Sequence, residues 1–360
     1  MESSGRDKIR VLVAEDSRFM SKMITEILSS DPMIEVAGIA YDGTEVLKKV
    51  ADLRPDCITL DLEMPKMDGL ETLRYLMSEW PTPVVILSAC SERAAIKALT
   101  CLDYGAVDFV AKSISGIDFQ AEELICKVKI AAAVNVSKVR FAPPHYRFNT
   151  ERGTVNSESL EGVVLIGAST GGPNVLMEII PSLPADIPAG IIVVQHMPEG
   201  FTRYLAERLD RRSDVEVKEA VDGDRIEPGR VLVAPGGRHL IYENRGDIPA
   251  VTVLPRNSSQ RTACPSIDFA LTSLAPVFKE RMVSVILTGM GKDGLSGCNV
   301  LRDFGGRVIV QSPESCIVSG IPGAIIRESL ADTVAEPVEI AGMIGEEISR
   351  LKTGRQIHGR

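Results

Sequence analysis

Short apolar runs alternate strictly with segments of helical periodicity over the first 130 residues, and this alternation restricts the fold more than any other feature. The apolar runs cover 9–14, 34–40, 57–61, 83–88 and 107–111. A chain of strand–helix repeats forms a parallel sheet with helices on both faces. The sequence therefore predicts an α/β domain of five such repeats over residues 8–130.

Polar side chains stand where these predicted strands end. They are Glu15 and Asp16 after the first strand, Asp61 at the third, Ser88 at the fourth and Lys112 at the fifth. In open parallel sheets the site lies at the carboxyl ends of the strands. Three neighbouring carboxylates repel one another unless a cation lies between them, and oxygen ligands alone select Mg²⁺. A single acid there is usually a helix cap, but five suitable groups at four strand ends favour a site.

This arrangement resembles the receiver domain of two-component response regulators, which has a flavodoxin-like (βα)5 fold. The resemblance implies that Asp61 accepts a phosphoryl group from a histidine kinase and that Mg²⁺ binds to Glu15, Asp16 and Asp61. It further implies that Lys112 and Ser88 contact the phosphoryl oxygens, and that Phe109 is the switching aromatic residue. Glu15 replaces the Asp of many receivers, and because it keeps the charge we expect Mg²⁺ binding to persist.

Residues 131–160 separate this domain from a second one. A helical pattern ends near residue 134, and the Pro-containing and polar run that follows shows no apolar periodicity. Such composition predicts an interdomain linker. Residues 161–352 then alternate again, which predicts a doubly wound, mainly parallel α/β catalytic domain with a small β insertion near 215–255.

Ser169 lies in the most distinctive turn of this second domain. Gly167-Ala-Ser169-Thr-Gly171 matches the strand-turn-helix pattern G-x-S-x-G, which exposes a serine hydroxyl above a sheet. By itself the pattern favours an ordinary Gly-rich turn with an incidental serine. However, His196 follows the apolar run 190–195, and Asp293 lies in the Gly-rich turn after 282–288. Serine needs an imidazole to take its proton, and the imidazole needs a carboxylate to orient it.

Other residues and other site types compete with this triad. Asp268 competes with Asp293 for the role of the acid, but a carboxylate in the first turn of a helix usually serves the helix. The backbone N–H groups of Thr170 and Met290 are candidate donors to an oxyanion. The chain order Ser, His, Asp differs from that of the α/β-hydrolases, and the glycine pattern lacks the middle glycine of a dinucleotide site.

The motifs of the second domain resemble those of the CheB family of chemotaxis response regulators. They include Gln195-His-Met197, Ala234-Pro-Gly-Gly-Arg-His239, Leu287-Thr-Gly-Met-Gly-Lys-Asp-Gly294 and Pro313-Glu-Ser-Cys-Ile-Val-Ser-Gly-Ile-Pro322. The resemblance implies a protein-glutamate methylesterase and protein-glutamine glutaminase that acts on chemotaxis receptors. It implies Ser169, His196 and Asp293 as catalytic residues, no cofactor in the catalytic site, a chemotaxis histidine kinase as phosphodonor, and inhibition by the unphosphorylated receiver.

Composition and charge indicate the cellular compartment of the protein and exclude some classes of partner. The seven cysteines are scattered and form no C-x-x-C pair, which is typical of reduced thiols in a cytoplasmic protein. The net charge of −9 argues against nucleic-acid binding. The first ten residues lack a secretory apolar region, and no apolar stretch reaches the ~20 residues of a membrane span. Two alternatives stay open: a paralogue with the same chemistry serving a non-chemotaxis sensory array, and a non-enzymatic receiver-output protein.

Overall fold

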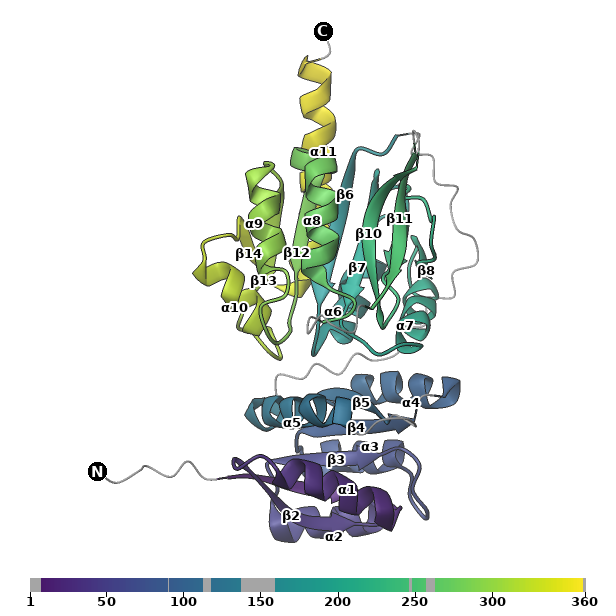
Figure 1. Cartoon of the computed structure of the whole chain (residues 1–360), viewed down its shortest axis with the longest axis vertical. Helices are drawn as coiled ribbons and strands as arrows, with labels where there is room; N and C mark the ends of the chain where they lie inside the picture. Colours follow the sequence, from purple (N-terminus) through teal and green to yellow (C-terminus); the bar gives the residue numbers. More distant parts are fainter. Residues whose placement is uncertain are drawn as a thin grey trace, which may run out of the picture. The chain divides into compact units, whose positions relative to one another are not determined.

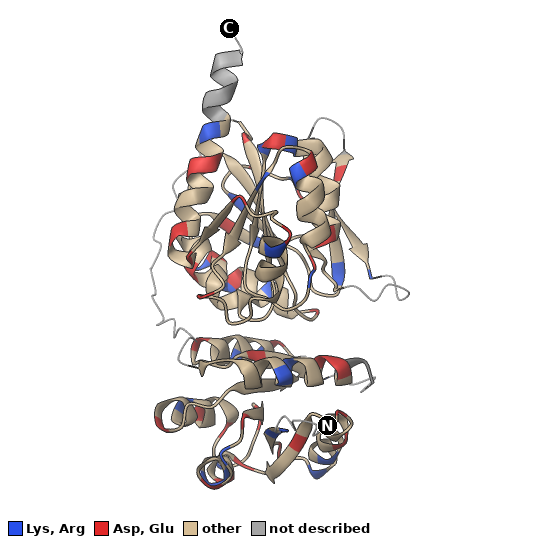
Figure 2. Cartoon of the chain, turned by 90° about the vertical axis from the view of Figure 1, so that its left-hand side faces the viewer, with Lys and Arg blue, Asp and Glu red and all other residues tan. Residues whose placement is uncertain are grey.

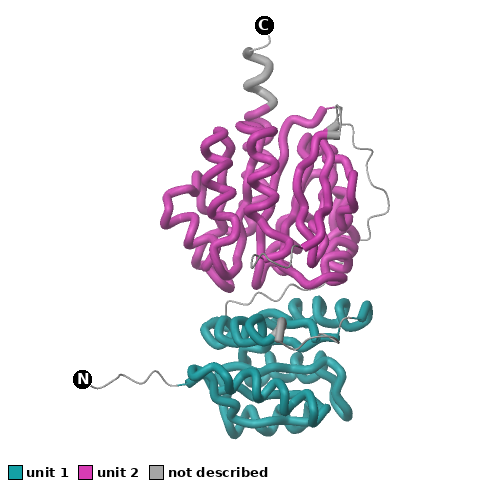
Figure 3. Tube along the Cα trace, viewed as in Figure 1, with its two compact units in different colours: residues 1–143 teal, residues 144–360 magenta. Residues whose placement is uncertain are grey.

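The protein consists of two compact units, Met1–Pro143 and Pro144–Arg360 (Figure 3). The structure is a computed structural model, and it describes residues 8–89, 91–112, 118–136, 159–245, 248–256 and 263–358. Most of the predicted linker, residues 137–158, lies outside the described residues. The domain limits 8–130, 131–160 and 161–352 therefore stay predictions.

The first unit is a five-stranded parallel sheet with the order β2-β1-β3-β4-β5 (Figure 1). This is the flavodoxin-like order, which confirms the predicted fold class. Helices α1 and α5 contact each other on one face of the sheet, and α2, α3 and α4 lie next to one another on the other face. In chain order the elements are β1 (Ile9–Ala14), α1 (Arg18–Ser29), β2 (Ile34–Ala40), α2 (Gly43–Leu53), β3 (Cys57–Asp61), α3 (Gly69–Glu79), β4 (Val84–Ala89), α4 (Glu92–Asp103), β5 (Asp108–Lys112) and α5 (Asp118–Ala133).

Side-chain caps decide where four of these helices begin. The Ser17 hydroxyl accepts a hydrogen bond from the Met20 N–H, as predicted for the start of α1. Asp42, Asp68 and Ser91 cap α2, α3 and α4 in the same way. A cap satisfies an N–H group that has no partner inside the helix. The helices therefore start close to the carboxyl ends of the strands, where the acidic residues lie.

The second unit contains a seven-stranded parallel sheet with the order β14-β13-β12-β6-β7-β9-β8. The order reverses its direction at β6, and such a switch point is where open parallel sheets place their sites. In chain order the elements are β6 (Gly162–Ala168), α6 (Gly172–Ile179), η2 (Ile180–Ser182), β7 (Ala189–Gln195), α7 (Phe201–Asp210), β8 (Glu216–Glu219), β9 (Arg230–Val233), β10 (Arg238–Arg245), β11 (Ile248–Pro255), α8 (Ile267–Phe278), η3 (Lys279–Arg281), β12 (Met282–Ile286), α9 (Leu295–Asp303), β13 (Arg307–Gln311), α10 (Gly320–Arg327), β14 (Thr333–Ala335) and α11 (Pro337–His358).

Close packing of α8 against β6 fixes one side of this switch point. Helices α8 and α9 lie side by side over the sheet (Figure 1). Ile267, the first residue of α8, is fully buried, and a Cβ added to Gly167 would lie 2.8 Å from its Cδ1. Only a glycine on β6 lets the helix come this near. The start of α8 is therefore held beside the end of β6.

The β insertion is narrower than predicted. β8 and β9 are parallel members of the main sheet, and only β10 and β11 form a separate antiparallel hairpin. The prediction placed β8 in the insertion because its alternating Val215-Glu-Val-Lys pattern is typical of an edge strand. β8 is indeed an edge strand, but it belongs to the seven-stranded sheet. The helix α10 and the three-residue strand β14 were not predicted.

Charged residues of opposite sign intermingle along the helices of both units (Figure 2). The ammonium group of Lys49 lies 3.0 Å from the carboxylate of Glu45, one turn away on α2. Exposed pairs of this kind contribute about 0.3–0.5 kcal/mol each. The fold therefore depends mainly on its apolar cores. Within the described residues, no helix is both long enough and apolar enough to cross a bilayer.

Candidate functional site

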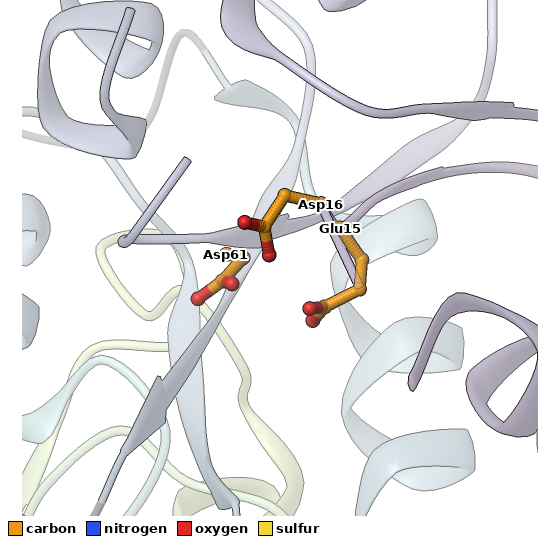
Figure 4. Close-up of side chains that lie close together, drawn as sticks. All are labelled: Glu15, Asp16 and Asp61. Carbon is orange, nitrogen blue, oxygen red and sulfur yellow. The ribbon is translucent and has the colours of Figure 1, made fainter. Parts of the chain in front are cut away.

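Three carboxylates gather at the carboxyl end of the receiver-like sheet (Figure 4). Glu15 and Asp16 follow β1, and Asp61 ends β3, which pairs directly with β1. One oxygen from each lies within 4.8 Å of the others. Glu15 and Asp61 are buried, whereas Asp16 is exposed. The structure thus brings together the three acids that the sequence predicted as metal ligands.

Lys112, at the end of β5, joins this cluster. Its Nζ lies 2.8 Å from Glu15 Oε2 and 2.8 Å from Asp61 Oδ2. Burial disfavours the ammonium ion, but the two carboxylates outweigh burial and raise the pKa of Lys112. Burial raises the pKa of Glu15, and the hydrogen bond from Lys112 only partly offsets it. One lysine leaves this oxygen-rich site short of positive charge, so its donor set fits Mg²⁺.

A tight loop holds the backbone of Asp61. The Gly69 N–H donates to the Leu62 carbonyl over 3.2 Å, so the start of α3 closes onto the end of β3. A Cβ at Gly69 would lie 2.1 Å from the Asp61 carbonyl oxygen. Any side chain there would displace Asp61 from its place beside Lys112.

Ser88 and Phe109 lie on β4 and β5, the strands on which the sequence places them. The Ser88 hydroxyl is fully buried and donates to the Ala94 carbonyl of α4 over 3.1 Å. Phe109 is buried too, and Lys127 of α5 donates to its carbonyl over 2.6 Å and lies 5.3 Å from the ring centroid. Their contribution to a phosphoryl switch stays a prediction.

Ser169 lies in the turn between β6 and α6 of the second unit. Its N–H donates to the Thr288 carbonyl over 3.0 Å, and its carbonyl accepts from the Gly172 N–H over 2.8 Å. Gly171 has a φ of +80°, the left-handed conformation that favours glycine. The partly exposed hydroxyl makes no hydrogen bond with the part of the chain that the structure describes.

His196 and Asp293 form a hydrogen-bonded pair next to this turn. The His196 N–H donates to the Ala168 carbonyl over 3.0 Å, which ties its backbone to the residue before Ser169. Its Nε2 lies 2.8 Å from Asp293 Oδ2. With Nε2 bound to the carboxylate, Nδ1 is the nitrogen that can accept a proton from Ser169.

The start of α8 holds the Asp293 carboxylate. It accepts hydrogen bonds from the Ser266 hydroxyl at 2.9 Å, the Ile267 N–H at 2.7 Å and the Asp268 N–H at 3.0 Å. Burial works against the charged carboxylate, but His196 and these N–H groups prevail and lower the pKa of Asp293. An ionised Asp293 can therefore orient the imidazole and stabilise its charged form.

Asp268, the other candidate for the catalytic acid, binds to the backbone of another helix. Its Oδ1 accepts from the Gly297 N–H on α9 over 2.7 Å. Burial raises the pKa of Asp268. Among the described residues it forms no hydrogen bond or ion pair with His196.

Thr170 and Met290, the predicted oxyanion donors, flank the serine. Thr170 follows it directly and is buried, and its carbonyl accepts from the Thr288 hydroxyl over 3.0 Å. Met290 is 46% exposed and follows Gly289, where an added Cβ would lie only 2.6 Å from the Ser169 Cβ. The ends of β6 and β12 thus place both residues beside Ser169.

Sequence reasoning assigned no role to Gln195, which lies against both Ser169 and His196. Its carboxamide Nε2 donates to the carbonyls of these two residues. The available signal was a polar residue at the end of an otherwise apolar strand, directly before the predicted histidine.

Both halves of the chain match known protein families. Residues 164–344 match the family described as CheB methylesterase, and residues 11–124 match the response regulator receiver domain. A protein of Symbiobacterium thermophilum, named protein-glutamate methylesterase/protein-glutamine glutaminase, is 45% identical over 93% of this chain and 96% of its own. A protein of Thermotoga maritima with the same name is 40% identical, over 92% and 96% of the two chains.

A solved structure matches the second unit. The crystal structure of the Thermotoga maritima CheB methylesterase catalytic domain is 43% identical and covers 51% of this chain and 97% of its own, with a TM-score of 0.50. Together with the matches along the sequence, this confirms the resemblance drawn from the motifs. The chain belongs to the CheB methylesterase family and carries a response regulator receiver domain ahead of its methylesterase domain.

Proposed function

We propose that this protein is a phosphorylation-activated hydrolase that demethylates glutamate methyl esters and deamidates glutamines on chemotaxis receptors in the cytoplasm. The observation that carries the proposal is the 2.8 Å pair of His196 Nε2 and Asp293 Oδ2 beside Ser169. The names of the relatives supply the substrate class, because they are protein-glutamate methylesterases and protein-glutamine glutaminases.

In the first half of the proposed reaction, Ser169 Oγ attacks the carbonyl carbon of the glutamate methyl ester. His196 Nδ1 takes the serine proton, and Asp293 stabilises the imidazolium that forms. The backbone N–H groups of Thr170 and Met290 bind the oxyanion, usually the largest catalytic contribution. His196 then protonates the methoxide, methanol leaves, and an acyl-enzyme ester on Ser169 is left.

Water completes the reaction. His196 takes a proton from a water molecule, whose oxygen attacks the acyl carbon, and the bond to Ser169 Oγ breaks. The proton returns to Ser169, and the receptor is released with a glutamate. With glutamine as the substrate, the same steps release ammonia in place of methanol.

The receiver supplies the switch in this proposal. Asp61 accepts the phosphoryl group of a phosphohistidine on a histidine kinase, and Lys112 stands within 2.8 Å of the Asp61 carboxylate to pair with the added charge. Glu15, Asp16 and Asp61 would hold Mg²⁺, which neutralises negative charge during the transfer. Phosphorylation then shifts the population toward molecules whose catalytic site is open to the receptor.

The direct test is methanol release from methylated receptor membranes. Wild-type protein should release methanol, and Ser169→Ala should lose the activity by several orders of magnitude. A non-enzymatic receiver-output protein would show no release from either form. A paralogue serving another array would hydrolyse a small glutamate methyl ester but leave chemotaxis receptors methylated.

A further inference from the structure

Gln195 connects the backbones of the predicted nucleophile and the predicted base. It ends β7 and is 1% exposed. Its Nε2 donates to the Ser169 carbonyl over 2.9 Å and to the His196 carbonyl over 3.1 Å. One buried carboxamide thus uses both of its N–H groups on the two residues between which a proton must pass.

The orientation of this carboxamide follows from its partners. Two carbonyl oxygens can only accept hydrogen bonds, so the NH₂ end must face them. Oε1 is then buried without a hydrogen-bond partner in the described part of the chain, packed so closely on α6 that a Cβ at Gly172 would lie 2.2 Å from it. A buried acceptor without a partner destabilises a fold. An apolar side chain would fill this space without that cost, so packing alone does not account for a glutamine.

A second buried glutamine supports the turn from the other side. Gln311 ends β13 and is fully buried. Its Oε1 accepts from the Thr288 N–H over 2.8 Å, and its Nε2 donates to the Ser315 carbonyl over 3.1 Å. The Thr288 carbonyl in turn accepts from the Ser169 N–H over 3.0 Å. A continuous set of hydrogen bonds therefore runs from Gln195 through Ser169 and Thr288 to Gln311.

We propose that Gln195 and Gln311 are positioning residues that hold the Ser169 turn in register with His196 and with the oxyanion donors. This inference rests on the proposed function, because it concerns the geometry of the same triad. Ser169 is fixed through its carbonyl on the β7 side and through its N–H on the β12 side. In the proposed mechanism the Ser169 hydroxyl must meet the imidazole, and a displacement of about 1 Å at such a site costs about 100-fold in rate.

The test replaces each carboxamide by a side chain of similar length that cannot donate. Gln195→Met and Gln311→Met are compared with wild type, and Ser284→Ala is the control. Ser284 is a buried polar residue of β12 whose hydroxyl, within the described residues, forms a hydrogen bond only with Cys298. Three quantities are measured on the whole chain: kcat and KM for methanol release, the rate of inactivation by a serine-directed fluorophosphonate, and the urea midpoint. The fluorophosphonate reports on the Ser169–His196 geometry without receptor binding.

We expect kcat and the inactivation rate of Gln195→Met to fall about 10- to 100-fold with little change in KM, which is more than any increase in the unfolded fraction accounts for. Gln311→Met should fall in the same direction, and Ser284→Ala should match wild type. A folded Gln195→Met with wild-type kcat and inactivation rate would overturn the proposal. A loss that only follows the fraction of unfolded protein would also overturn it, since it would show a purely structural role.

Two further variants keep the result decisive. If Gln195→Met does not fold, Gln195→Asn keeps the carboxamide but is one methylene too short to reach both carbonyls. The same loss of kcat supports the proposal, and a wild-type rate contradicts it. Ser169→Ala is run in parallel, because methanol release by that variant would refute the proposed function itself, whatever the glutamine variants show.

Discussion

His196 Nε2 and Asp293 Oδ2 lie 2.8 Å apart although 97 residues separate them in the sequence. The same carboxylate accepts hydrogen bonds from the Ile267 and Asp268 N–H groups at the start of α8. Asp293 thus has two functions at once, as the partner of the imidazole and as an acceptor for a helix N-terminus. The two can be separated by experiment.

Asp293→Asn should lower kcat on the order of 10⁴-fold, because a neutral amide does not stabilise the imidazolium and can hold the wrong tautomer. Its carbonyl oxygen can still accept from α8, so we expect the protein to fold. Methanol release and circular dichroism measure the two effects. The matched control is Asp268→Asn, whose carboxylate accepts from Gly297 on α9; it should keep kcat within a few-fold. Equal loss in both variants would contradict the assignment.

The two aspartates should also differ in how they link stability to pH. The pKa of Asp293 is lowered from 3.8, so its stabilising contribution is present above that value and is lost as the pH falls through its folded pKa. Removing it in Asp293→Asn should make the acid loss of stability shallower. The pKa of Asp268 is raised, so its contribution has the opposite sign and Asp268→Asn should make the loss steeper. Urea midpoints between about pH 5 and pH 3 test this.

Many residues of the two candidate sites could be predicted from the sequence, because they directly follow predicted strands. Parallel strands of one sheet end on the same edge, so residues that follow its buried apolar runs come near one another. Asp61 and Lys112 do so in the first unit, and Ser169 and His196 in the second. Which atoms then meet depends on side-chain direction. That is why the sequence could not show that the Ser88 hydroxyl binds to α4 or that the Gln195 carboxamide binds to the Ser169 carbonyl.

Most strands and helices of the fold could also be predicted from the sequence. The runs 9–14, 34–40 and 57–61 match their strands end for end, because each is mainly apolar and has charged residues close to both ends. β14 has three residues, too few for a periodic pattern, and α10 contains Gly320, Pro322 and Gly323, which disfavour helices in isolation. Tertiary packing forms these elements, and Ile321 and Ile325 of α10 are fully buried.

Gly289 should tolerate no side chain. A Cβ there would lie 2.6 Å from the Ser169 Cβ, so Gly289→Ala must push the serine or the Met290 backbone out of place. We expect kcat to fall about 100-fold or more. Gly342→Ala in α11 is the matched control and should keep full activity, because outside the adjacent backbone of the helix no described atom lies within 4 Å of the added Cβ. Wild-type kcat in Gly289→Ala would show that Ser169 does not need its present position.

Asp61→Asn should abolish phosphoryl incorporation from a small phosphodonor in the presence of Mg²⁺, because the amide is not a nucleophile for phosphorus. Glu63→Gln changes an exposed acid of the same loop and should incorporate normally. Intact-mass spectrometry measures the added phosphoryl group. Chelation of Mg²⁺ should stop incorporation in wild type as well, since Glu15, Asp16 and Asp61 would lose the ion that screens them. Incorporation into Asp61→Asn would assign the phosphoryl group to another residue.

The central claim is that phosphorylation of Asp61 controls a hydrolase built on Ser169. Its most direct test is methanol release from methylated receptors by wild type, Asp61→Ala and Ser169→Ala, each with and without a small phosphodonor and Mg²⁺. We predict that the phosphodonor stimulates wild type, that Asp61→Ala keeps the basal rate without stimulation, and that Ser169→Ala is inactive under both conditions. Stimulation of Asp61→Ala, or methanol release by Ser169→Ala, would contradict the account.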